Sequence, residues 1–267
     1  MRLVVGALLL LLAPGCASAD MVRLEGHPTQ GGLMIGHAPP GAHITLDGKP
    51  IRPTQAGDFV FGFGRDQAAK AELVVDWDGK TEPHSIAVAP RSWEVQSVTG
   101  LPPQTVTPPP EVMDRITREN AILIEARATD SDDEAFLKPF VWPADGPISG
   151  VYGSQRVLNG EPRQPHMGLD IAAPEGAPVR AAAAGRVTLA EPDLFYTGGT
   201  ILIDHGHGLS TIYVHMSALL VKTGTLVTQG EEIGKVGKTG RAAGPHLHFG
   251  VNWFSERLDP ALLLPAR

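Results

Sequence analysis

The sequence predicts a mainly β protein with one connecting α-helix, and two observations support this fold class. Short runs of β-branched, aromatic or alternating apolar residues recur along most of the chain. Between them lie many turn-forming residues, since 31 glycines and 24 prolines make up more than a fifth of the 267 residues. We therefore expect antiparallel sheets of short strands rather than a helical bundle.

Length and charge set limits on the domain count and on the partners. A chain of 267 residues is long enough for two domains after an N-terminal processing segment. The formal net charge is −7, with no long basic run, so we do not expect nucleic acid as a partner. Cys16 is the only cysteine, which excludes a disulfide bond within the chain.

Residues 1–19 have the pattern of a signal peptide. Arg2 supplies a positive end, residues 3–13 form an apolar run too short to span a bilayer, and residues 17–19 offer a small-residue cleavage site. The alternative processing is lipidation at Cys16, which would anchor the chain in a membrane. Either route predicts an exported protein of the periplasm or cell envelope.

Residues 20–95 predict a small β-sandwich-like domain. Asp47-Gly48 and Asp78-Gly79 are typical hairpin turns between apolar runs. The runs that we expect to form strands lie at 33–35, 43–46, 59–63, 72–77 and 85–88. Four histidines in this region share no spacing and no acidic partner, so we interpret them as ordinary surface residues: His27, His37, His43 and His84.

Residues 96–135 predict a proline-rich linker followed by a helix. The prolines of 96–110 favour a stiff, extended connection. A helix is expected over 111–128, with one apolar face formed by Val112, Ile116, Leu123 and Ala126. That face must be buried against a flanking domain or in self-association. The acidic residues 130–134 then indicate a solvated loop.

Four histidines and an aspartate between residues 166 and 248 have the spacing of a metal site. His166 and Asp170 are four residues apart and His246 and His248 are two apart, so each pair would share one face of a strand. His215 ends the β-branched run 211–214, and a further strand is expected over 200–203. Imidazole and carboxylate ligands suit zinc and leave a position for water. A lone histidine is more often structural than a ligand, and the H-x-H pattern alone is weak.

Several motifs in the C-terminal part resemble those of the lysostaphin or LytM type of zinc metallopeptidases. They are HMGLDI at 166–171, GAPV at 176–179, AGRV at 184–187, YVHM at 213–216, VTQGEEIG at 227–234, TG at 239–240 and GPHLHF at 244–249. The landmarks keep the family's order over about 130 residues. The resemblance implies a mostly antiparallel β-sheet peptidase domain over 136–267, beginning near Phe140 and opening with a strand and turn over 146–153.

The same resemblance implies the roles of individual residues. Carried over position by position, His166, Asp170 and His248 are the ligands of one zinc ion per chain. His215 and His246 take the places of the two non-ligand catalytic histidines. Relatives that have lost ligands act only as activators of other wall hydrolases, whereas this chain keeps all five positions.

The sequence also suggests structural roles for two further stretches near these motifs. The polar segment 154–165 is longer than a tight hairpin requires, so we expect it to form one wall of a substrate groove. His205 and His207 flank Gly206 and suggest a second metal site, but a turn between two strands is the favoured interpretation.

The function implied is that of an exported zinc metalloendopeptidase acting on peptide cross-links of peptidoglycan. A zinc-activated water would attack the amide, with one of His215 and His246 accepting its proton. The residues do not decide which histidine is the base. The alternative function is a non-catalytic wall-binding protein or an activator of another wall hydrolase. A helix or added domain that covers the groove and restrains activity is a further hypothesis.

Overall fold

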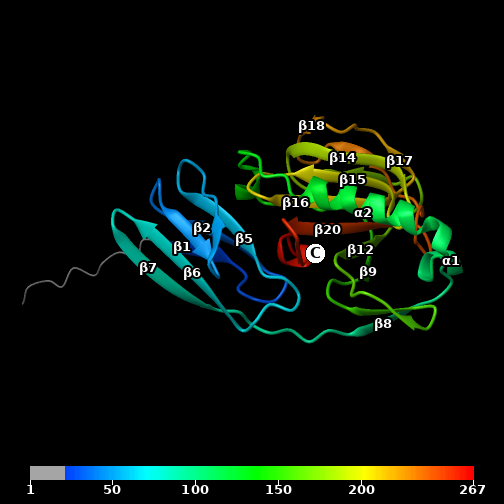
Figure 1. Cartoon of the computed structure of the whole chain (residues 1–267). Helices are drawn as coiled ribbons and strands as arrows, with labels where there is room; N and C mark the ends of the chain where they lie inside the picture. Colours follow the sequence, from blue (N-terminus) through cyan, green and yellow to red (C-terminus); the bar gives the residue numbers. More distant parts are fainter. Residues whose placement is uncertain (1–21) are drawn as a thin grey trace, which may run out of the picture.

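The computed structural model describes residues 22–267, so the predicted signal peptide and Cys16 lie outside the described residues. The chain forms a small N-terminal sandwich and a larger C-terminal β domain, joined by a segment that runs along the lower edge of Figure 1. One long helix is present among these residues, and the fold class is confirmed as mainly β with antiparallel sheets. No helix within 22–267 is both long and apolar enough to cross a membrane.

The N-terminal sandwich consists of two antiparallel sheets that enclose a phenylalanine-rich core. One sheet has the order β1-β2-β5, with β1 (Arg23–Gly26), β2 (Leu33–His37) and β5 (Asp58–Gly62). The other has the order β4-β3-β6-β7, with β4 (Lys49–Ile51), β3 (His43–Leu46), β6 (Lys70–Trp77) and β7 (Lys80–Ala87). Phe59, Phe61 and Phe63 lie in its core.

The expected hairpin turns of this sandwich are present and have the geometry that their sequence predicts. Asp78 and Gly79 both have positive φ, 48° and 72°, and join β6 to β7. Asp47 and Gly48, with φ of 49° and 74°, join β3 to β4 in the same way. Two consecutive left-handed residues match the twist of a two-residue hairpin, which is why Asp-Gly is favoured there.

The linker is less extended than its prolines predict. It contains the strand β8 (Val95–Val98), the short helix α1 (Pro103–Val106) and the 3-10 turn η1 (Pro110–Val112). Proline has a φ already suited to the first helical turn, so Pro103 begins α1 instead of prolonging an extended segment. β8 pairs in parallel with β10 (Gln155–Leu158), which also pairs with β11 (Glu161–Pro162).

The C-terminal domain is organised around an eight-stranded antiparallel sheet with the order β18-β14-β15-β16-β20-β12-β9 and β21 paired to β20. The strands are β9 (Ile148–Gly150), β12 (Leu169–Ala172), β14 (Gly185–Leu194), β15 (Gly198–Asp204), β16 (Leu209–Met216), β18 (Leu226–Val227), β20 (His246–Trp253) and β21 (Glu256–Leu258). A smaller sheet, β13-β19-β17, contains β13 (Pro178–Arg180), β17 (Ala218–Leu219) and β19 (Glu232–Lys235). Short 3-10 turns lie at η2 (Ala135–Leu137) and η3 (Pro260–Leu262).

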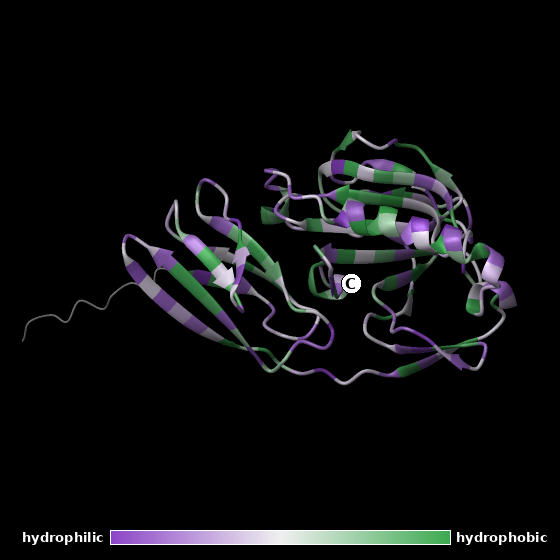
Figure 2. Cartoon of the chain, viewed as in Figure 1, coloured by the Kyte–Doolittle hydropathy of each residue, from purple (hydrophilic) through white to green (hydrophobic). Residues whose placement is uncertain are grey.

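Both faces of the central sheet are covered, and this explains the continuous apolar sequence of its middle strands. Ile201 and Ile203 of β15 point into the main core, whereas Leu202 points to the opposite face. There it meets Leu123 and Ala126 of α2 (Met113–Arg127). In Figure 2, β15 is largely green (hydrophobic), whereas β7 at the outer edge carries many hydrophilic residues. The apolar face predicted for the helix is thus buried against the C-terminal domain.

Candidate metal centre and groove

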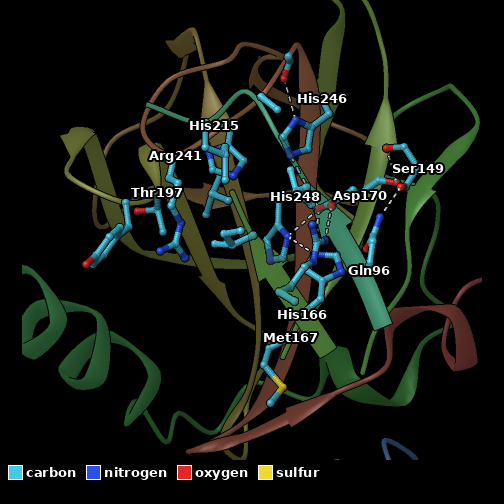
Figure 3. Close-up of a pocket in the computed structure, with 18 of the residues that line it drawn as sticks. Gln96, Ser149, His166, Met167, Asp170, Thr197, His215, Arg241, His246 and His248 are labelled. Carbon is cyan, nitrogen blue, oxygen red and sulfur yellow. Dashed lines mark hydrogen bonds and ion pairs between the residues drawn. The ribbon is translucent and has the colours of Figure 1, made fainter. Parts of the chain in front are cut away.

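Three of the predicted site residues meet on neighbouring strands of the central sheet. Asp170 of β12 lies directly opposite His248 of β20 in the antiparallel register. Their side chains contact each other, with Asp170 Oδ1 2.8 Å from His248 Nδ1. His166 Nε2 lies 2.9 Å from each of these two atoms. Figure 3 shows the side chains of His166, Asp170 and His248 pointing toward one another.

His166 reaches this point from a loop and not from a strand, which corrects the expectation that His166 and Asp170 share one strand face. β12 begins only at Leu169. The His166 amide instead donates to Ser154 O, and the Gly153 amide donates to His166 O. Gly168 lets the loop cross close to β20, because a Cβ at Gly168 would lie 2.6 Å from both His248 Nε2 and Phe249 O. A strand and a loop can both bring together two side chains that are four residues apart. Here the segment from His166 to Gly168 is a loop, which approaches β20 closely at Gly168.

The orientation of the rings leaves lone pairs facing one point. His166 Nδ1 donates to Val151 O at 2.9 Å, so its Nε2 carries no proton when the ring is neutral. Its neighbours there are Asp170 Oδ1, an acceptor, and His248 Nδ1. Convergence of two imidazole nitrogens and a carboxylate oxygen suits a divalent cation, since a cation satisfies all three lone pairs together.

The electrostatics of the cluster favour the charge states that bind a metal. Burial raises the pKa of Asp170, but the neighbouring His166 and His248 rings outweigh this effect and hold that pKa well below its usual range. Burial lowers the pKa of His248 against the opposing effect of the Asp170 carboxylate. An ionised carboxylate beside a neutral imidazole is the state that a metal ligand set requires.

His215 and His246 lie beside this cluster, with ring centroids 4.8 Å apart. His215 Nδ1 donates to Thr239 O at 2.8 Å, and His246 Nδ1 donates to Gly244 O at 2.8 Å. Each ring is thereby held in the tautomer whose Nε2 is free. His246 Nε2 lies 3.8 Å from Asp170 Oδ1. The two histidines can therefore present proton-accepting nitrogens beside the three converging side chains.

A β-bulge turns His215 toward the site. Gly199 faces Met216 and Ile201 faces Tyr213 across β15 and β16, so two residues of β16 oppose one of β15. His215 is one of the two residues that oppose Thr200, and it has a φ of 65°, a left-handed conformation that costs free energy for a residue with a Cβ. Burial, together with the charges of His246 and His248, lowers the pKa of His215 to about 3.

The five side chains line a groove with a volume of about 480 Å³. The polar segment predicted to form a wall does so through Arg156, Leu158, Gln164 and Pro165. It contains a tight hairpin after all, because Asn159 and Gly160 join β10 to β11 with φ of 49° and 89°. The extra length beyond this turn lies at 163–165, next to His166.

Two groups of groove residues were missed by sequence reasoning. Arg156 Nη2 donates to Asp170 Oδ2 at 2.7 Å, and an arginine inside the predicted wall segment was the only available signal. Gln96, Val98 and Leu101 of the linker also line the groove. No local pattern indicates that contact, since it depends on the parallel pairing of β8 with β10.

The histidines at 205 and 207 have structural partners. His205 is fully buried, with Nδ1 donating to Ala184 O at 2.7 Å and Nε2 accepting from Thr211 Oγ1 at 2.8 Å. His207 has a φ of 52° in the turn, and its Nδ1 donates to Arg52 O at 2.9 Å. These contacts agree with the turn interpretation and leave neither ring directed at a second metal position.

Comparisons with known proteins agree with this geometry. Residues 164–260 match the model of Peptidase family M23. A crystal structure of a protein from Pseudomonas aeruginosa assigned to peptidase M23 is similar to 88% of this chain and 94% of its own, with 30% identity and a TM-score of 0.66.

Two curated relatives are similar over shorter regions. Cell division protein DipM of Caulobacter vibrioides is 33% identical over 169 residues, which are 60% of this chain and 26% of DipM. Peptidoglycan DD-endopeptidase ShyB of Vibrio cholerae is 44% identical over 87 residues, 33% of this chain and 20% of ShyB. The chain thus spans about a quarter or less of the length of these two relatives. Matching motifs and a shared fold over nearly the whole length of a family structure lead to one conclusion: this chain belongs to peptidase family M23.

Proposed function

We propose that this protein is an exported zinc metalloendopeptidase that hydrolyses peptide bonds in peptidoglycan cross-links. The observation that carries the proposal is the meeting of His166 Nε2, Asp170 Oδ1 and His248 Nδ1 within 2.9 Å of one another in an open groove. The membership of a peptidase family and the similarity to a relative named as a peptidoglycan DD-endopeptidase support the substrate class. Export rests on the apolar N-terminal pattern of residues 1–19.

In this proposal, His166, Asp170 and His248 hold one zinc ion. A bound zinc would supply Lewis acidity, polarising the substrate carbonyl and lowering the pKa of water from 15.7 toward about 7. The donor set is two neutral imidazoles and one carboxylate, the type of ligand set that leaves a coordination position free in hydrolytic sites. Arg156 binds the second oxygen of Asp170 and thereby reserves the first for the metal.

In this proposal, His215 and His246 are the candidates for general base and general acid, acting through their free Nε2 atoms. Either atom can accept a proton from the attacking water, and the protonated ring can then donate to the leaving amine. The backbone carbonyls of Thr239 and Gly244 hold the two rings in place through their Nδ1–H groups. The water supplies only one proton, so the other histidine stays neutral in this step and can orient the attacking water by accepting a hydrogen bond at its Nε2.

The test is digestion of purified sacculi, followed by mass spectrometry of the released peptides. Zinc-loaded protein should release uncrosslinked peptides with a new amino terminus, and the fragment masses identify the bond. Chelation should stop the release and stoichiometric zinc should restore it. A zinc-loaded, folded protein that binds sacculi without cleaving any cross-link would contradict the proposal and favour the wall-binding or activator alternative.

A further inference from the structure

Arg241 presents a guanidinium group to the groove on the side of His215 (Figure 3). Its side chain lies over the ring of Tyr196, with Cζ 4.6 Å from the ring centroid. Its backbone amide donates to Tyr196 O at 2.8 Å. Gly240 lets the two loops approach, because a Cβ there would lie 2.5 Å from Gly198 N. Arg241 is therefore fixed in position by the same loop whose Thr239 carbonyl orients His215.

This guanidinium has little to pair with in the protein. Its guanidinium makes one long hydrogen bond, from Nη1 to Thr105 O of the linker at 3.4 Å. Within residues 22–267, no carboxylate lies within ion-pair distance of Arg241. Its neighbours differ, since Arg156 is paired with Asp170 and Arg163 lies 3.7 Å from Glu161. A half-buried arginine without a carboxylate keeps its charge and retains unused donors.

The groove around Arg241 is short of negative charge. Asp170 is the only carboxylate among the described residues that line it, and both of its oxygens are engaged by Arg156 and the histidines. Burial lowers the pKa of Arg241, and the charges of Arg163 and Arg156 lower it further against the effect of Tyr196. This local excess of positive charge contrasts with the net charge of −7 of the whole chain.

We propose that Arg241 binds a free carboxylate of the substrate peptide and makes the enzyme selective for acidic peptides over neutral ones. The proposal rests on the proposed function, because the ligand is the peptide that the groove receives. The fork of the guanidinium suits two parallel hydrogen bonds to a carboxylate, and the half-buried site strengthens them. In the free protein, the Thr105 carbonyl takes one of these donors and is displaced when the peptide binds.

The experiment measures binding and not turnover. The probes are a cross-linked peptide isolated from sacculi and the same peptide after its carboxylates have been converted to carboxamides. Both are titrated calorimetrically into full-length, zinc-loaded protein with His246→Ala, so that the peptides stay intact. A charge-assisted, bidentate contact predicts that the acidic peptide binds about 10-fold or more tightly than its amide.

Variants of Arg241 assign that preference to one side chain. Arg241→Gln should bind the two peptides with nearly equal affinity, and Arg241→Lys should keep only part of the preference because it loses the fork. Arg186→Gln is the control, since Arg186 is exposed on β14 and does not line the groove. In the active enzyme, Arg241→Gln should raise KM for the acidic peptide more than KM for its amide.

The outcomes separate this inference from the proposed function. Equal affinity of wild-type Arg241 protein for both peptides, a preference that survives in Arg241→Gln, or no binding of either peptide overturns the inference, whether or not the enzyme cleaves sacculi. A preference that depends on Arg241 in a protein that never cleaves a cross-link supports the carboxylate site and removes the endopeptidase assignment.

Discussion

Asp170 divides its two carboxylate oxygens between two tasks. Oδ1 faces His166 and His248, whereas Oδ2 accepts a 2.7 Å hydrogen bond from Arg156. Gly150 leaves room for this pair, because a Cβ there would lie 2.4 Å from Asp170 Oδ2. The carboxylate is therefore held so that one oxygen points at the proposed metal position.

Replacing Arg156 by methionine should weaken zinc binding. The change keeps an apolar stem of similar length but releases Asp170 Oδ2, and loss of such an outer contact typically costs about 10–100-fold in metal affinity. Competition against a chelating dye measures this directly, with Arg186→Met as the exposed control. An unchanged zinc affinity in Arg156→Met would show that Arg156 does not position the ligand.

His205 should make stability depend on pH. Its burial lowers its pKa from 6.5 to about 4, so the unfolded chain binds a proton first as the pH falls. The stability that comes from the neutral ring is complete above about pH 6.5 and is lost as the pH falls toward 4. Between pH 7.5 and 5 the loss is about 2 kcal/mol.

Urea unfolding of the wild type and of His205→Asn at both pH values isolates this contribution. The variant should be less stable at pH 7.5, because asparagine leaves a small cavity, but its stability should fall by about 2 kcal/mol less on acidification. If the pH dependence is the same in both proteins, His205 does not titrate as its burial requires.

At the scale of single elements, helix α2 shows how burial against the sheet determines the contribution of a side chain to stability. Leu123 is 7% exposed against the sheet, whereas its neighbour Ile124 is 66% exposed. Leu123→Ala should lower the free energy of unfolding by about 2–4 kcal/mol, since it leaves a cavity next to Leu202 and Ile212. Ile124→Ala, the matched change in the same helix, should cost under about 1 kcal/mol. Equal losses in urea unfolding would mean that α2 does not dock on the sheet as described.

Elements that are determined by neighbouring residues in the chain could be predicted from the sequence, whereas elements that depend on pairing with a distant strand could not. The helix and its apolar face followed from a 3.6-residue period, and the hairpins followed from Asp-Gly pairs. The bulge at His215 could not be predicted, because it arises from the register between β15 and β16 and no glycine marks it. Likewise, β8 has no strand signal of its own and depends on its pairing with β10.

The sequence likewise predicted one part of the site and not the rest. The five residues of the proposed metal and catalytic set lie in short motifs, so their positions could be proposed before any coordinates. Arg156 and Arg241 acquire meaning only through neighbours that are distant in the chain, Asp170 and Tyr196. The linker wall of the groove follows from tertiary packing alone.

At the scale of the whole molecule, the two domains share one core. Leu33 and Val60 from the N-terminal sandwich belong to the same buried cluster as Leu258 and Phe249 of the C-terminal domain. Ion pairs add to this junction, since Arg52 contacts Asp130 and Asp132; Arg65 donates to Gly153 O at 2.8 Å. The sandwich is thus packed against the end of the sheet at β21, and the linker is the part that borders the groove.

A shared core predicts that the two domains unfold together. Calorimetry should give one heat-absorption peak, and Leu258→Ala should shift that whole peak to lower temperature because it opens a cavity at the junction. Two separate peaks, of which only one moves in the variant, would show that the domains are energetically independent.

The most direct test of the central claim is the zinc content of three purified proteins, measured by elemental analysis after dialysis. Wild type and His246→Ala should each retain about one zinc per chain, with turnover on sacculi lost in the variant. His248→Ala should retain none, because it removes one of the three converging ligand atoms. Stoichiometric zinc in His248→Ala, or a wild type that binds none, would contradict the account.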